Sequence, residues 1–163
     1  MHLLSFLLII FYVNKEKPRI EPKRVEISRR AEVVDGRIET LHQYLSKRES
    51  PLMESSASFI RIADKYGLDW TLLPAIAGVE SGFEKAGNTR DHNPFGYMCK
   101  SGPCYFSSFD ESIEEVAHSI GTGSAYKAYR DSGSISVLAR VYNYVSPDDW
   151  TAKIKYFQKK INE

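Results

Sequence analysis

Short apolar stripes with helical spacing, each bounded by start or stop signals, fill residues 50–163 and constrain this chain to a mainly helical fold. Ser50-Pro51 is typical of an N-cap followed by proline in the first turn, and Gly67 ends the stripe that follows. Asp69 is expected to cap the next helix, which Gly82 ends. Three later stripes, one of them opening on a Ser-x-x-Glu capping box and closing on glycine, predict helices over 108–121, 134–143 and 146–161.

Residues 84–107 lack helical periodicity and are rich in turn formers, so they interrupt the helical pattern. Phe95–Met98 and Tyr105-Phe106 are expected to form two short strands joined by a Lys-Ser-Gly-Pro turn. The predicted fold class is therefore mainly α, with one short β-hairpin in an α+β arrangement.

Cys99 and Cys104 flank that turn. Their spacing favours a disulfide that closes the hairpin, with free thiols and a zinc site as the alternatives. A zinc site would need two further ligands, and His92 and His118 are poorly placed in the pattern, so we expect no metal. A disulfide would imply an oxidising, extracytoplasmic setting.

The first 49 residues differ in composition from the rest. Residues 1–13 form a hydrophobic segment that is too short to span a bilayer and resembles a signal peptide core or a shortened anchor. Residues 14–49 combine a charged linker with an amphipathic helix over 25–47, which is either a stalk or packs on the domain at 50–163. The basic residues after the hydrophobic segment favour a cytoplasmic side, in conflict with a disulfide, unless the natural start lies upstream.

The net charge of +1 gives no basis for nucleic-acid binding. Glu80 is the residue that points to chemistry. It follows Leu73, Ile76 and Ala77 on one helical stripe, where the spacing calls for an apolar side chain. Burial there would disfavour the ionised carboxyl group, as a general acid requires. The alternative is that the helix frays at Ser81 and Glu80 reaches solvent.

Four motifs in order form a recognisable pattern: Glu80-Ser81 at a helix end, Asn93-Pro94-Phe95-Gly96, the segment Tyr105–Ile113, and Tyr142-Asn143. This pattern resembles the endo-beta-N-acetylglucosaminidase-like domain of bacterial peptidoglycan hydrolases, in the lysozyme-like superfamily, over residues 58–161. The resemblance implies a lysozyme-like fold and cleavage of beta-1,4 bonds in the glycan strands of peptidoglycan, with no cofactor.

In that reading, Glu80 is the catalytic acid that protonates the departing glycosidic oxygen. The candidate substrate-binding residues are Asn93, Phe95, Gly96, Tyr97, Tyr142 and Asn143. Packing or turn formation is the alternative for several of them: core packing for Phe95 and Tyr142, and a turn for Asn93. We expect a monomer that is extracytoplasmic, either secreted or anchored to the membrane through its N-terminal segment.

The second catalytic group is not evident. The hairpin between Met98 and Tyr105 holds no acid, and Asp91 and Glu84 are the nearest candidates. A substrate N-acetyl group is a known substitute for the second carboxylate. A lytic transglycosylase would also fit a single acid, although its usual Gly-Leu-Met-Gln stretch is absent. A wall-binding module without activity and a helical adaptor working through 25–47 are the alternatives outside enzymes.

Overall fold

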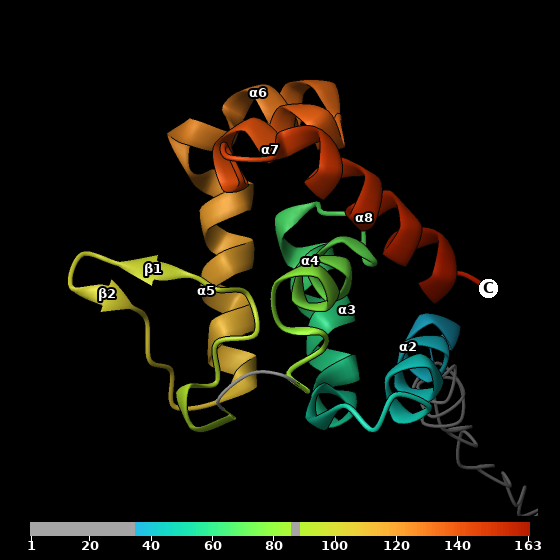
Figure 1. The fold of residues 1–163 in the computed structure, drawn as a ribbon. Helices are drawn as coiled ribbons and strands as arrows, with labels where there is room; N and C mark the ends of the chain where they lie inside the picture. Colours follow the sequence, from blue (N-terminus) through green and yellow to red (C-terminus); the bar gives the residue numbers. More distant parts are fainter. Residues whose placement is uncertain (1–34, 86–88) are drawn as a thin grey trace, which may run out of the picture. The chain divides into compact units, whose positions relative to one another are not determined.

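Seven α-helices and one two-stranded hairpin make up the regular structure of residues 35–85 and 89–163, the part that the computed structural model describes (Figure 1). The mainly helical prediction is confirmed. The helices are α2 (Gly36–Ser46), α3 (Ser56–Tyr66), α4 (Leu72–Ser81), α5 (Phe109–Thr122), α6 (Lys127–Ser132), α7 (Ile135–Tyr142) and α8 (Pro147–Ile161). Short 3-10 turns cover Pro51–Ser55, Thr89–Asp91 and Ser124–Tyr126.

Helix α4 is the centre of the core. Every residue from Leu72 to Gly78 is buried, so the helix is apolar on all sides and must be surrounded by others. Figure 1 shows it between α3, α5 and α8, and α8 packs along it. Gly82, at a φ of 62°, ends the helix in the left-handed conformation that glycine adopts easily. The end of this helix carries Glu80.

Helix α2 corrects the predicted first helix. Asp35 is extended at a ψ of 112° and its carboxylate accepts a hydrogen bond from Arg37 N, so the helix begins at Gly36. Leu41, Tyr44 and Leu45 are buried against the domain, and α2 therefore belongs to the same compact unit as the later helices. The hydrophobic segment 1–13, the linker at 14–24 and the first part of the predicted helix, 25–34, lie outside the described residues. Among the described helices, none is both long and apolar enough to cross a membrane.

The hairpin is shorter than predicted. Strands β1 (Met98–Cys99) and β2 (Gly102–Pro103) pair antiparallel, and Tyr105-Phe106 lies beyond the second strand. Cys99 and Cys104 form the disulfide, with sulfur atoms 1.99 Å apart. The Cys104 N–H donates to the Tyr97 carbonyl oxygen (3.0 Å), which continues the pairing by one bond past the disulfide.

Two further predictions need correction. Ser108 caps α5 through Glu111 N, as predicted, but the Glu111 carboxylate accepts from Ser107 N (2.6 Å) instead of completing the box on Ser108. Gly121 does not close α5, which continues to Thr122. A Cβ on Gly121 would lie 2.8 Å from Tyr66 Cβ, so close packing of α5 on α3 explains this glycine. Helix α6 had no counterpart in the sequence analysis.

We expect Gly121→Ala to destabilise the protein. The added methyl group meets an atom fixed to the α3 backbone, and overpacking of this kind costs about 1–3 kcal/mol. That loss exceeds the gain of about 1 kcal/mol that alanine brings to a helix. Gly36→Ala is the matched control, because its Cβ would meet no atom of the described residues within 4 Å. Urea unfolding of both variants measures the difference, and equal stabilities would contradict the packing explanation.

Candidate active site

Glu80 lies in the last turn of α4, and its side chain is exposed. The stripe that precedes it is buried as predicted, but the expected burial of Glu80 itself is wrong. The helix ends one residue later and Gly82 turns the chain away, so the final position of the stripe projects beyond the core. The carboxyl group is therefore accessible to a substrate.

Trp150 holds this carboxyl group in place. Its indole N–H donates to Glu80 Oε1 at 2.7 Å. Trp150 belongs to α8 and is buried in the core of the protein, with 1% of its surface exposed. A buried ring has one orientation, so it fixes Oε1. Because Oε1 accepts the indole hydrogen, Oε2 is the oxygen left to carry a transferable proton. Trp150 falls within the helix predicted over 146–161, but its place in the sequence does not relate it to Glu80.

Gly96 brings the loop backbone close to the other carboxyl oxygen. A Cβ on this residue would lie 3.4 Å from Glu80 Oε2, and its φ is 58°, in the left-handed region. Both observations favour glycine at this position. The loop backbone therefore approaches Glu80 closely at Gly96.

Asn93 organises the loop that presents Gly96 and Tyr97. Its amide nitrogen donates to the carbonyl oxygens of Tyr97 (2.9 Å) and Cys104 (3.1 Å), and its Oδ1 accepts from Tyr97 N (2.9 Å). These bonds use both amide hydrogens and the oxygen. Asn93 therefore supports the hairpin, in keeping with a turn-forming role. Asn143 is also engaged locally, since its Oδ1 accepts from Ser146 N (3.1 Å) in the loop before α8.

Tyr142 connects the loop to Trp150. Its hydroxyl group donates to the Phe95 carbonyl oxygen (3.1 Å), and its ring stacks on Trp150 with centroids 5.3 Å apart. Burial raises the pKa of Tyr142 well above its usual value, and the negative charge of Glu80 acts in the same direction. The phenol is therefore a neutral donor. The Phe95 side chain is fully buried, so this residue contributes its carbonyl group and packs the core.

A cavity of about 230 Å³ opens beside these residues, lined by Gly96, Tyr97, Met98, Tyr126 and Tyr142. Tyr126 comes from the 3-10 turn after α5. It was not predicted as a site residue, because no helical or strand pattern marks that turn. Burial raises the pKa of Tyr126, and proximity to Tyr97 adds to the effect. Three tyrosine side chains thus line this cavity, and Gly96 in its wall lies next to the exposed carboxyl group of Glu80.

Neither Glu84 nor Asp91 lines the tyrosine cavity, and each stays a predicted second carboxylate. Glu84 is 3% exposed, and the charges that influence its pKa are those of Asp91 and His92. Asp91 lies in the 3-10 turn Thr89–Asp91 with its backbone carbonyl accepting from Phe106 N (3.0 Å). Among the described residues in contact with Trp150 and Gly96, Glu80 supplies the carboxyl group of the candidate site. Within residues 35–85 and 89–163, no cluster of His, Cys, Asp and Glu has the arrangement of a metal site.

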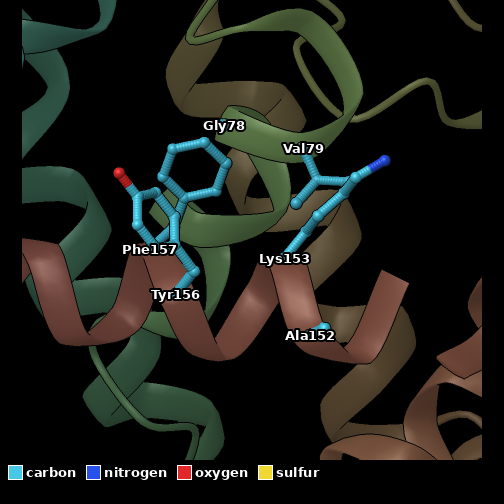
Figure 2. A pocket seen from close by; sticks show the side chains of 6 residues that line it. All are labelled: Gly78, Val79, Ala152, Lys153, Tyr156 and Phe157. Carbon is cyan, nitrogen blue, oxygen red and sulfur yellow. The ribbon is translucent and has the colours of Figure 1, made fainter. Parts of the chain in front are cut away.

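A larger cavity of about 500 Å³ lies between α4 and α8 (Figure 2). Figure 2 shows Gly78 and Val79 of α4 facing Ala152, Lys153, Tyr156 and Phe157 of α8. Its lining is mainly apolar, and its one cation, Lys153, pairs with Asp149 at 2.7 Å. No carboxyl group belongs to the described residues that line this cavity, so we place the candidate chemistry at Glu80.

No protein family, curated protein or solved structure matches this chain.

Proposed function

We propose that this protein is a glycosidase that cleaves beta-1,4 bonds in the glycan strands of peptidoglycan, of the endo-beta-N-acetylglucosaminidase type. The observation that carries the proposal is an exposed carboxyl group, Glu80, fixed by the Trp150 indole beside a tyrosine-lined cavity. Glycosidic oxygens leave poorly unless protonated, and one accessible carboxyl group supplies that proton. Aromatic walls suit the apolar faces of sugar rings.

The proposed reaction uses a single protein carboxyl group. Glu80 Oε2 gives its proton to the glycosidic oxygen as the bond to C1 breaks, and the acetamido oxygen of the same sugar attacks C1. Water then opens this cyclic intermediate and returns a proton to Glu80. In this mechanism the substrate's own acetamido group takes the place of a second carboxylate, an accepted exception to the two-carboxylate rule.

A lytic transglycosylase is the second candidate, and the same observation favours it. With one carboxyl group, Glu80 can protonate the leaving oxygen and then accept a proton from a hydroxyl group of the same glycan, which attacks C1 in place of water. The product then has an internal anhydro ring and lacks one water relative to the hydrolysis product. Mass therefore separates the two reactions.

The disulfide supports the proposed location. A bond between Cys99 and Cys104 is typical of proteins that fold in an oxidising compartment. We therefore propose that the protein acts outside the cytoplasm, secreted or anchored through its N-terminal segment, and that it works as a monomer.

The test is digestion of purified peptidoglycan by the full chain in mild detergent, followed by mass spectrometry of the soluble products. We expect fragments that end in reducing N-acetylglucosamine. Fragments one water lighter would support the transglycosylase. Tight binding to peptidoglycan without any soluble fragment would replace both with a wall-binding module.

A further inference from the structure

The turn that ends α4 holds an uncommon backbone conformation. Gly82, Phe83 and Glu84 all lie in the left-handed region, with φ values of 62°, 62° and 64°. Glycine adopts this conformation freely, but phenylalanine and glutamate rarely do. A run of this kind persists only where the surrounding structure holds it in place. Glu80 lies directly before this turn, so the contacts that hold the turn also hold the end of α4.

The Phe83 side chain and the backbone of the turn hold its first half in place. The Phe83 ring is buried against Tyr44 and Phe157, with centroids 5.6 Å and 5.1 Å away. Ser50 Oγ donates to the Phe83 carbonyl oxygen (2.8 Å), and Phe83 N donates to Ala77 O (3.1 Å). The first half of the turn is therefore anchored by apolar packing and hydrogen bonds that do not depend on pH.

Glu84 anchors the second half, and its environment does depend on pH. Its backbone N–H donates to Ser81 Oγ (2.9 Å), and its side chain is 3% exposed. The carboxyl oxygen Oε2 is buried and, within residues 35–85 and 89–163, has no hydrogen-bond partner. A neutral carboxyl group tolerates this position better than a charged one, because burial disfavours a charge and Oε2 has no donor among the described residues.

The charged groups that face Glu84 do not neutralise it. Asp91, a like charge, disfavours an ionised Glu84, whereas His92 favours it. The adjacent Lys85 pairs instead with Glu49, at 3.8 Å on the surface. Burial is the largest influence and raises the pKa of Glu84; the Ser81 hydroxyl opposes it, Asp91 adds to it and His92 opposes it.

We propose that Glu84 is a positioning residue, which fixes the end of α4 and hence Glu80 only while its own carboxyl group is uncharged. When Glu84 ionises, the carboxylate leaves the core for water and the left-handed turn loses its second anchor. Glu80, four residues upstream, then moves relative to Trp150. The effect on catalysis rests on the proposed function, but the opening of the turn does not.

The direction with pH follows from linkage. The folded turn keeps the proton of Glu84 above the ordinary glutamate pKa of 4.5, whereas the open turn releases it. The contribution of Glu84 to the stability of the turn is thus complete below pH 4.5, the ordinary glutamate pKa. It is lost as the pH rises through the higher pKa that Glu84 has in the folded turn. Between the two values, the equilibrium constant for opening grows up to about tenfold per pH unit.

Hydrogen exchange at the amides of Phe83 and Glu84, which donate within the turn, tests this without substrate. In the full chain, protection at these amides should fall with pH beyond the intrinsic exchange rate, by up to about tenfold per unit above pH 4.5. In Glu84→Gln, which cannot ionise, protection should stay constant. Glu84→Met provides the same test without a buried amide, should the Gln variant fold poorly.

Parallel pH curves for the unmodified chain and both variants would overturn the proposal. An activity measurement then distinguishes a failure of the Glu84 proposal from a failure of the proposed function. If peptidoglycan is cleaved, the alkaline limit of the rate should move to higher pH in Glu84→Gln. If no chain cleaves peptidoglycan, the proposed function fails, and the exchange data still decide whether Glu84 holds the turn.

Discussion

Glu80→Gln is expected to abolish measurable cleavage of peptidoglycan. Glutamine keeps the shape of the side chain and can still accept the Trp150 indole hydrogen, but it has no proton to give to the leaving oxygen. A general acid contributes about 10²–10⁴ in rate, so we expect a fall of that size in kcat, with substrate binding largely retained. Release of soluble fragments and binding to insoluble peptidoglycan are measured on the same preparation.

The matched control for this substitution is Glu115→Gln. Glu115 is an exposed glutamate on α5, and its replacement should change neither the rate nor the stability by a measurable amount. If Glu80→Gln cleaved peptidoglycan as fast as the unmodified chain, Glu80 would not be the acid and the proposed mechanism would be wrong. If Glu80→Gln also unfolded at a lower temperature, the loss of rate would have a structural cause.

The helices were predictable wherever local residues decide the backbone. Gly67 and Gly82 end their helices in the left-handed conformation, and Pro147 begins α8, as their chemistry predicts. The first helix was misjudged at Asp35, because an apolar spacing that runs through a cap residue looks continuous in the sequence. Helix α6 was missed because its six residues carry a single buried side chain, Tyr129, too little to form a stripe.

The candidate acid was found for a reason that is partly wrong. The stripe on α4 pointed to Glu80, yet the residue is exposed because the helix stops where the stripe leaves the core. A sequence pattern gives the face of a helix but not where that face meets solvent. The exposure makes the Glu80 carboxyl group accessible to a large substrate. The groups that orient this carboxyl group therefore matter more for the proposed role than its burial.

Those orienting groups were beyond prediction because they come from distant parts of the chain. Trp150 lies 70 residues from Glu80, and neither local spacing nor composition relates the two. Tyr126 likewise has no pattern around it. Asn93 stays a predicted substrate-binding residue, and its hydrogen bonds to Tyr97 shape the loop, which a sequence motif does not reveal.

Trp150→Phe is expected to lower kcat by about 10–100-fold while KM changes little. Phenylalanine fills most of the buried site but has no N–H, so Oε1 of Glu80 loses its donor and the carboxyl group gains rotational freedom. Misorientation of a catalytic group on this scale has effects of this size. The smaller ring also leaves a void beside Tyr142, for which we expect a loss of roughly 1–2 kcal/mol in stability.

Trp70→Phe separates the two effects. Trp70 is the other tryptophan of the chain and packs partly buried against the same core, so its replacement also removes part of a ring. It should reduce stability without a comparable fall in kcat. Steady-state kinetics on soluble glycan fragments and thermal unfolding are measured for both variants. Equal losses of kcat in the two would mean that the Trp150 indole acts through packing alone, and that its hydrogen bond does not orient Glu80.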